Sequence, residues 1–279
     1  MKWIETRREH RLTTTQQRDL VSDLEVACDA EGRMLGLRGR MIHDNGAFAP
    51  YGLLLPMTGL DLLQGPYTLG AIDITMDVVY TNAVPTSPIR GALRPNAAFI
   101  IERAIDAVAD HLGIDRFEVR RRNFIPADAF PSAVPGDARY GGKITYDSGA
   151  YEAALDAVSD LADLAGFENR RMRSQQRGLL RGLGVASYVA DTGLGPFEEV
   201  GMDSAADGTV TVTAMTGSQG QGQATVYTQI CASSLGVDPA IVNVRSADSD
   251  LPRTGGSTVP SRTAVTAGSS APLAAEALA

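Results

Sequence analysis

The sequence is poor in the residue types that bind metal ions or form disulfides. Its 279 residues include two cysteines, Cys28 and Cys231, and three histidines. The cysteines lie far apart in the chain, and their spacing matches neither a zinc site nor a disulfide framework. Two isolated cysteines also cannot supply the four thiolates of an iron–sulfur cluster. We therefore expect no metal site built from clustered side chains.

Positive charge and long apolar runs are also scarce. The 25 Lys and Arg residues face 33 Asp and Glu residues, which gives a net charge of −8. An acidic chain argues against binding to nucleic acid or to an anionic membrane. No stretch approaches the ~18 consecutive apolar residues of a membrane helix, and the charged N-terminus lacks the apolar core of a signal peptide. The expected location is the cytoplasm.

Glycine is the residue that the sequence has in excess. It accounts for 29 of 279 residues, or about 10 %, against about 7 % in an average protein. Ten of the glycines fall between residues 178 and 222. The other proportions, 44 % hydrophobic and 21 % charged, are ordinary for a folded chain of one large or two average domains.

The spacing of apolar residues predicts an α+β chain in two modules. A period of two predicts strands over 22–43 (a hairpin turning at 30–33), 74–82, 182–190, 198–205, 209–215 and 241–246. The Asp-Gly pair in Ala206–Gly208 predicts a second hairpin, between the strands over 198–205 and 209–215. A period of 3.6 predicts helices over 96–112 (ended by Gly113), 115–124 (capped by Asp115), 148–164 (capped by Ser148) and 224–235, and a last helix starting near Pro272. Prolines and glycines predict a linker over 125–147, which separates residues 1–124 from residues 148–279. No internal repeat is visible.

The first of three notable loops is Pro88–Pro95, which leads into the helix over 96–112. A glycine between Arg90 and Arg94, at the start of a helix, can present cations and backbone N–H groups to an anion. An ordinary strand-to-helix connection with solvated arginines explains this loop equally simply.

The second loop, Thr216–Gln223, holds three glycines and three glutamines. Glycine allows the backbone to approach a ligand closely, and the glutamines add uncharged amide donors and acceptors. The following helix favours a negative group at its N-terminus. The glycine spacing matches neither the dinucleotide-binding fingerprint nor a P-loop, so the loop predicts a ligand site of another kind.

The third loop, Gly255–Thr263, is rich in glycine, serine and threonine and ends at Arg262 and Thr263. Backbone N–H groups and hydroxyls suit a phosphate or a polar heterocycle. A Ser/Thr/Gly-rich stretch is also typical of a plain surface loop.

Side chains for acid–base or nucleophilic catalysis are poorly represented. No Gly-x-Ser-x-Gly elbow occurs with a plausible acid and histidine, and the three histidines are isolated. The run Arg120–Arg122 is interpreted as the solvated end of a helix, where positive charge complements the dipole. Cys231 is interpreted as a core residue.

Eight motifs in order resemble the molybdopterin-binding large subunit of the xanthine dehydrogenase, aldehyde oxidase and aerobic carbon monoxide dehydrogenase family. They are KWIETRREH, DNGAF, PIRGALRP, LGIDRFEVRRRNFI, YDSGAYEAAL, RGLGVA, GSQGQGQAT with QICASSLGV, and GSTVPSRT. The resemblance implies two molybdopterin-binding modules, both incomplete, each a mixed sheet with packed helices. Residues 1–124 would belong to the first and 148–279 to the second.

The resemblance also implies a cofactor and partners. The cofactor would be a molybdenum–molybdopterin dinucleotide, in its cytosine form, whose metal carries its own ligands. The protein would oxidise an aldehyde or an N-heterocycle, with water as the oxygen source. Its electrons would pass to a small subunit with 2Fe-2S clusters and a medium subunit with FAD.

Site residues are carried over by position. Those near the metal ligands and the pterin would be Gly217, Gln219, Gly220, Gln221 and Gly222. Those binding the polar groups of the dinucleotide would be Thr258, Ser261, Arg262 and Thr263. Those on the substrate side of the metal would be Arg90, Gly91, Ala92 and Leu93.

The substrate-side loop departs from two patterns in the family it resembles. Carbon monoxide dehydrogenases carry a copper-binding cysteine at the position of Gly91, and the more usual pattern in the other group is Arg-Gly-Ala-Gly-Arg. Leu93 replaces its second glycine and would add bulk near the substrate, so the substrate itself is not transferable.

Two parts of the family pattern do not occur in the chain: a first glycine-rich loop, expected before its start, and a catalytic glutamate, expected beyond its end. That glutamate would act as the base. We therefore expect an internal segment of a longer subunit, inactive by itself. The alternatives are a non-catalytic binding module that keeps the scaffold and a generic phosphate- or nucleotide-binding domain.

Overall fold

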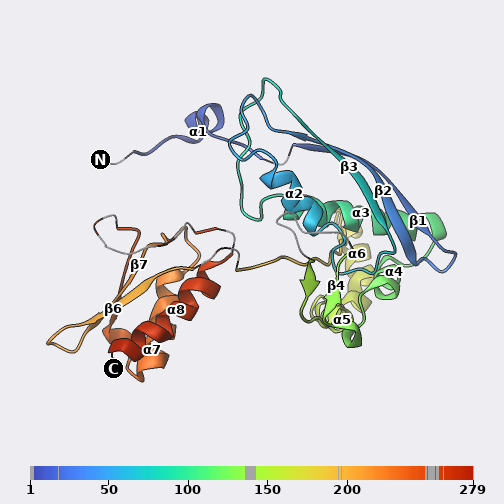
Figure 1. Cartoon of the computed structure of the whole chain (residues 1–279). Coiled ribbons are helices and arrows are strands. Elements are labelled where there is room, and N and C mark those ends of the chain that lie inside the picture. Colours follow the sequence, from blue (N-terminus) through green and yellow to red (C-terminus); the bar gives the residue numbers. More distant parts are fainter. Residues whose placement is uncertain are drawn as a thin grey trace. The chain divides into compact units, whose positions relative to one another are not determined.

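The chain folds into two compact units in a computed structural model, Met1–Ala190 and Asp191–Ala279 (Figure 1). The structure describes residues 3–17, 19–135, 143–193, 195, 197–248, 250, 255, 258–259 and 261–278. Among these residues, no helix is long and apolar enough to cross a membrane.

The first unit is built on a mixed sheet of three strands in the order β1-β2-β3. The strands are β1 (Leu20–Cys28), β2 (Met34–Asp44) and β3 (Ile72–Val79). The predicted hairpin is confirmed, because β1 pairs antiparallel with β2. Asp29 Oδ1 accepts the backbone N–H groups of Glu31 and Arg33 and so closes the turn. The third strand pairs parallel with β2, which makes the sheet mixed.

The described part of the first unit also contains helices. They are α1 (Arg7–Thr13), α2 (Leu54–Asp61), α3 (Arg94–Leu112), α4 (Arg116–Asn123), α5 (Tyr151–Leu161) and α6 (Phe167–Gln176). Figure 1 shows α3 lying across the sheet, and its residues Ile101 and Ile105 are fully buried in the same core cluster as Leu37 and Met41 of β2. Leu155 of α5 joins this cluster.

Helix ends follow the predicted capping residues in the first unit, with one exception. Gly113 ends α3 in the left-handed conformation, and Asp115 Oδ1 accepts the N–H groups of Phe117 and Glu118. The prediction that Ser148 caps the next helix is wrong: α5 begins at Tyr151, and Ala150 precedes it without a side-chain cap. The helix starts where its apolar face first meets the core, because packing supplies most of a helix's stability.

The predicted linker contains short regular pieces. They are a 3₁₀ turn η1 (Ala127–Ala129) and the paired strands β4 (Ser132–Ala133) and β5 (Thr145–Tyr146). The strand predicted over 182–190 is wrong, because these residues form no strand. Side chains hold this extended segment instead: Arg120 Nη2 donates to Val185 O at 3.2 Å.

The second unit is a mixed sheet of the order β6-β7-β8 with two helices against it. Its strands are β6 (Val200–Ser204), β7 (Val210–Ala214) and β8 (Val242–Ser246), its helices are α7 (Gln223–Leu235) and α8 (Thr263–Leu278), and its 3₁₀ turn is η3 (Pro239–Ile241). The strands β6 and β7 form the predicted hairpin, and β8 is parallel to β7. Figure 1 shows α7 and α8 side by side, and the two helices are in contact.

The core of the second unit confirms one prediction and corrects another. Cys231 is fully buried with Val212 and Tyr227, and burial raises the pKa of its thiol to about 11, as expected of a core residue rather than a nucleophile. The last helix does not start near Pro272, because α8 begins at Thr263 and contains that proline. Burial of its alanine face offsets the missing hydrogen bond.

The two units repeat one topology that the sequence does not reveal. Each contains an antiparallel hairpin, a crossover helix, a third strand parallel to the second, and a further helix that contacts the first strand. The unit boundary follows Ala190, whereas the sequence places the domain boundary in the linker over 125–147. The division into family domains over 1–124 and 148–279 stays a prediction.

Candidate functional site

The predicted cofactor loops lie at one edge of the second sheet. Residues 215–222 follow the carboxyl end of β7 and lead into α7, and residues 247–262 follow the carboxyl end of β8 and lead into α8. Because these two strands are parallel, their loops begin at the same edge, where open α/β sheets bind ligands. Thr258 Oγ1 donates to Gly217 O at 2.7 Å and joins the two loops.

The glycine–glutamine loop is anchored at its base and open at its tip. Thr216 Oγ1 and Tyr227 Oη lie 2.8 Å apart, both buried, and fix the start of the loop to α7. Gly220 and Gly222 have φ values of +92° and +81°, which favour glycine. Apart from the neighbouring residues in the chain, no atom of the described residues lies within 4 Å of a Cβ placed on either. The tip therefore has room for a ligand beside its backbone.

The two exposed glutamines of the loop interact with each other. Gln219 N donates to Gln221 Oε1 at 2.6 Å. This bond occupies the backbone N–H of Gln219, which could otherwise donate to a ligand. Both residues are where the sequence placed them, next to the N-terminus of α7.

The first turn of α7 offers donors with no competing acid. It contains no acidic residue, and no side chain in the described part of the chain caps the helix. The backbone N–H groups of a first turn have no partner within their own helix, and they favour a negative or polar acceptor. Gln223 begins this helix. Its amide atoms Nε2 and Oε1 are buried and have no hydrogen-bond partner in the described part of the chain.

Arg262 is buried and ion-paired, an arrangement that the sequence did not predict. Its exposed fraction is 8 %, and its Nη2 donates to Oε1 of Glu198, which is 2 % exposed. A Cβ at Gly195 would overlap the guanidinium, and one at Gly255 would overlap the Glu198 carboxylate. These two glycines are needed for the close approach, so Arg262 holds several loop segments together.

The remaining dinucleotide-side residues lie at the start of α8. Ser261 is exposed and has a φ of 55°, an uncommon conformation for serine. Thr263 begins the helix, and its Oγ1 is buried with no partner among the described residues. Together with Thr258 these residues bring three hydroxyls to the same edge of the sheet.

The substrate-side residues lie in the first unit, after β3 and before α3. Arg90 and Gly91 are exposed, and Ala92 has a positive φ of 51°. A Cβ at Gly91 would lie 2.8 Å from the ring of Pro95, so the tight turn requires glycine. Leu93 differs from the other three residues, because its side chain is 1 % exposed.

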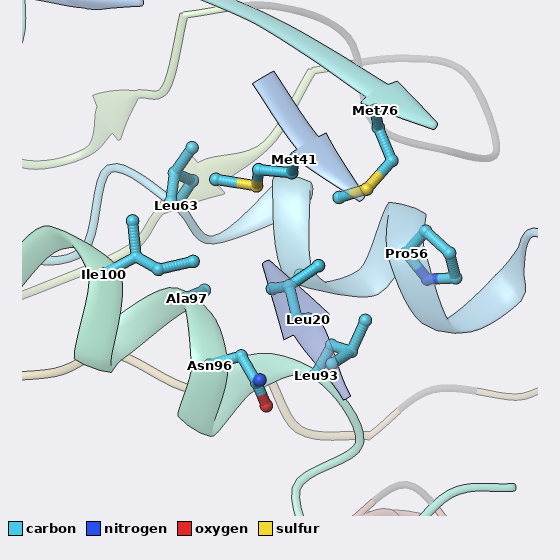
Figure 2. A pocket seen from close by; sticks show the side chains of 10 residues that line it. Leu20, Met41, Pro56, Leu63, Met76, Leu93, Asn96, Ala97 and Ile100 are labelled. Carbon is cyan, nitrogen blue, oxygen red and sulfur yellow. The ribbon is translucent and has the colours of Figure 1, made fainter. Parts of the chain in front are cut away.

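Leu93 borders a small cavity between the sheet, α2 and α3 (Figure 2). Met41 and Met76 line it from the sheet, and Ala97 and Ile100 line it from α3. The cavity volume is about 10 Å³, enough for one water molecule and far too small for a cofactor. It is a packing defect in the core rather than a binding site.

The first-unit core also holds a buried cluster of charges that corrects an interpretation from the sequence. Arg120 is not solvated, because it is 0 % exposed. It donates to Glu102 Oε2 at 2.7 Å and to Asp106 Oδ1 at 2.9 Å. Tyr67 Oη donates to Glu102 Oε1 at 2.5 Å. Helical spacing explains this: Arg120 lies on the side of α4 that faces α3.

The described residues contain no group of three or more His, Cys, Asp or Glu side chains that could hold a metal ion. The donor set at the second sheet edge consists instead of amides, hydroxyls and backbone N–H groups. It fits an organic group that brings a metal with its own ligands. The unsatisfied amide of Gln223 is the observation that fits such a group best.

Comparisons with known proteins give the domain family of the chain. Residues 1–124 and residues 157–279 each match a family described as a molybdopterin cofactor-binding domain. The chain is thus made of molybdopterin-binding domains.

Three relatives define the family more closely. The chain is 34 % identical to subunit gamma of the 6-hydroxypseudooxynicotine dehydrogenase complex of Paenarthrobacter nicotinovorans, over 99 % of this chain and 35 % of that protein. It is 31 % identical to the carbon monoxide dehydrogenase large chain of Hydrogenophaga pseudoflava, over 99 % of this chain and 36 % of that protein. The structure of quinoline 2-oxidoreductase from Pseudomonas putida 86 superposes with a TM-score of 0.82 at 28 % identity, over 99 % of this chain and 36 % of that one.

The chain belongs to the xanthine dehydrogenase, aldehyde oxidase and carbon monoxide dehydrogenase family of molybdopterin-binding large subunits. It spans about a third of the length of the relatives it matches.

Sequence reasoning missed three residues of the second-unit site. Glu198 lies in a segment with no motif, and nothing in the sequence connects it with Arg262. Nothing in the sequence around Gly195 indicates that it packs against the side chain of Arg262. Gln223 lies inside the glutamine-rich loop, but its burial depends on tertiary packing.

Proposed function

We propose that this chain is the molybdopterin-binding part of the large subunit of a molybdenum hydroxylase. The observation that carries the proposal is the pair of joined loops at the carboxyl edge of β7 and β8, with uncharged amides and hydroxyls around two helix N-termini. The matches to molybdopterin-binding domains on both sides of the linker support it.

Each site residue has a task in this proposal. Gly220 and Gly222 let the backbone approach the pterin, and Gln219 and Gln221 exchange their mutual bond for bonds to the bound group. Thr258, Ser261 and Thr263 bind polar groups of the dinucleotide, which we propose is the cytosine form. Arg262, neutralised by Glu198, positions this loop.

The substrate side is formed by the loop before α3. Arg90, Gly91 and Ala92 would face the substrate, and Leu93 would shape the loop from behind. The chemistry that the bound group supplies is the two-electron hydroxylation of a C–H bond with oxygen from water. An N-heterocycle or an aldehyde is the proposed substrate class.

We further propose that the electrons leave to an iron–sulfur subunit and an FAD subunit in a cytoplasmic complex. Two relatives support this, because one is subunit gamma of a dehydrogenase complex and the other is the large chain of a carbon monoxide dehydrogenase.

Cofactor analysis tests the proposal. The protein that carries these residues is purified from a host that makes the molybdenum cofactor, and molybdenum and pterin are measured by mass spectrometry and fluorescence. We expect both, in equal amounts. Neither would indicate a non-catalytic module, and nucleotide without molybdenum would indicate a generic nucleotide-binding domain.

A variant tests the site. Gln221→Ala should reduce cofactor content about tenfold, because one good hydrogen bond is worth about 1.4 kcal/mol. Gln229→Ala, at an exposed position on α7, serves as the control. Unchanged cofactor content in Gln221→Ala would contradict the assignment of this loop.

A further inference from the structure

Gln223 carries a buried amide that the described part of the chain leaves unsatisfied. The residue is 5 % exposed, and neither Nε2 nor Oε1 has a hydrogen-bond partner there. Burying a polar group without a partner costs about 1–3 kcal/mol, and folded proteins rarely leave one so. A buried amide with both of its ends unmet therefore needs an explanation.

The position of Gln223 supplies one. It is the first residue of α7 and follows Gly222, whose backbone is in the left-handed conformation. No side chain among the described residues caps this helix. The corresponding first residue of α8, Thr263, also has a buried hydroxyl without a partner among the described residues. The loops in front of the two helices are joined by the bond from Thr258 to Gly217. Unmet polar groups thus occur at the starts of both helices that border the proposed site.

The amide chemistry restricts the ligand group. Nε2 requires an acceptor and Oε1 requires a donor, so a phosphate, which offers acceptors, satisfies only half of the side chain. A heterocycle that carries an N–H beside a carbonyl or ring nitrogen satisfies both. Such an edge occurs on a pterin and on a nucleobase.

Access to Gln223 requires the loop in front of it to move. Gly220 and Gly222 have open space around them, and the tip is held by the bond between Gln219 and Gln221. A ligand that takes over the donors and acceptors of these glutamines would release the tip.

We propose that Gln223 is a further ligand-binding residue, whose carboxamide pairs with the donor–acceptor edge of a heterocycle of the cofactor once the tip of the loop opens. This inference rests on the proposed function. It adds a contact from inside α7 to those assigned to the loop before it.

The test compares Gln223→Met with Gln229→Met, a glutamine at an exposed position on the same helix. Methionine keeps the length of the side chain and removes both polar atoms. Two quantities are measured: molybdenum and pterin retained after dialysis, and the thermal midpoint of cofactor-free protein from a host that cannot make molybdopterin.

We expect Gln223→Met to retain about tenfold less cofactor and yet to unfold at a midpoint equal to or above that of the wild type. In the loaded protein, the substitution removes the hydrogen bonds between the amide and the cofactor and so weakens binding. In the cofactor-free protein, it removes a buried amide that has no partner and so removes the desolvation cost of that group. Gln229→Met should change neither quantity. Wild-type retention, or a lowered cofactor-free midpoint, would overturn the proposal and make Gln223 structural.

Two further outcomes separate failure of the proposed function from failure of this inference, and pairing with the pterin from pairing with the nucleobase. A wild-type protein without molybdenum or pterin would overturn the proposed function as well, whereas a loaded wild type with an equally loaded Gln223→Met overturns this inference alone. Loading with molybdopterin that lacks the nucleotide identifies the source: the defect persists if Gln223 pairs with the pterin and vanishes if it pairs with the nucleobase.

Discussion

At the scale of single residues, Arg120 is the side chain on which the first unit depends most. It lies between two carboxylates, Glu102 and Asp106, and also donates to the backbone of Val185. Burial raises the pKa of Tyr67, and the Glu102 charge adds to this, so the phenol stays protonated and donates. Every member of the cluster thus has a partner.

Removing the arginine should be costly. Arg120→Met would leave two largely buried carboxylates without their cation, which costs about 3–5 kcal/mol. Arg171→Met removes an exposed pair with Glu168 and should cost less than about 1 kcal/mol. Urea unfolding of the two variants measures the difference. Similar midpoints would mean that the buried cluster contributes no more than a surface pair.

The imidazole of His43 should make stability depend on pH. The residue is 0 % exposed, and burial lowers its pKa, opposed by Asp44, Asn45 and Asp19. Its ordinary value is about 6.5. As the pH falls below that value, the unfolded chain binds a proton that the folded chain resists. The free energy of unfolding then falls, by at most about 1.4 kcal/mol per pH unit.

The His43→Gln variant isolates this contribution. Between pH 7.5 and 5.5 it should lose less unfolding free energy than the wild type does, whatever its stability at neutral pH. Denaturant titrations at both pH values give the two differences. Equal losses would show that His43 does not contribute to this dependence.

At the scale of elements, two glycines with the same backbone conformation should respond differently to alanine. Gly113 ends α3 with a φ of +66° and open space around it, whereas a Cβ at Gly46, with a φ of +69°, would overlap the carbonyl of Val84. Gly113→Ala should cost about 1–2 kcal/mol, the cost of the left-handed conformation alone.

Gly46→Ala should cost clearly more, because the backbone segments at Gly46 and Val84 must separate as well. Unfolding midpoints of the two single variants test this. If Gly46→Ala is as mild as Gly113→Ala, the contact between the loop after β2 and the segment before α3 is looser than the structure has it.

Elements whose evidence is local were predictable. The hairpin turn at 30–33 and the end of α3 at Gly113 follow from residues that act on their own neighbours in sequence. The strand predicted over 182–190 was wrong, because a strand also needs a neighbouring strand to pair with. The alternation of apolar residues along one segment does not reveal whether such a neighbour exists. The prediction that the last helix starts near Pro272 was wrong, because burial of the alanine face of α8 outweighs the preference of proline for the first turn of a helix.

At the scale of the whole molecule, the proposed function predicts where the cofactor changes the chain. Loading should slow amide hydrogen exchange in residues 217–223 and 261–263, which border the proposed site. The hairpin turns over 29–33 and 206–208 lie at the opposite ends of their central strands and should not change. Hydrogen-exchange mass spectrometry of loaded and cofactor-free protein tests this. Protection spread evenly over both turns would contradict a site at the carboxyl edge.

The common topology of the two units also belongs to this scale. It places the loops after β2 and β3 of the first unit in the same topological positions as the loops after β7 and β8 of the second. The substrate-side loop at Arg90–Leu93 and the dinucleotide loop at Ser261–Thr263 thus occupy equivalent positions in their units. No sequence repeat indicates this, because topology can persist when side chains differ.

The sequence by itself determined the α+β class, the places of the hairpins and most helices, and the glycine- and glutamine-rich loops that resemble a molybdopterin site. These properties depend on periodicity, turn chemistry and motif order, which are read along the chain. Only the tertiary structure decided that Arg262 pairs with Glu198, that Arg120 is buried, and that the amide of Gln223 is buried with no partner among the described residues. Burial and pairing join residues far apart in sequence, and packing through space selects those partners.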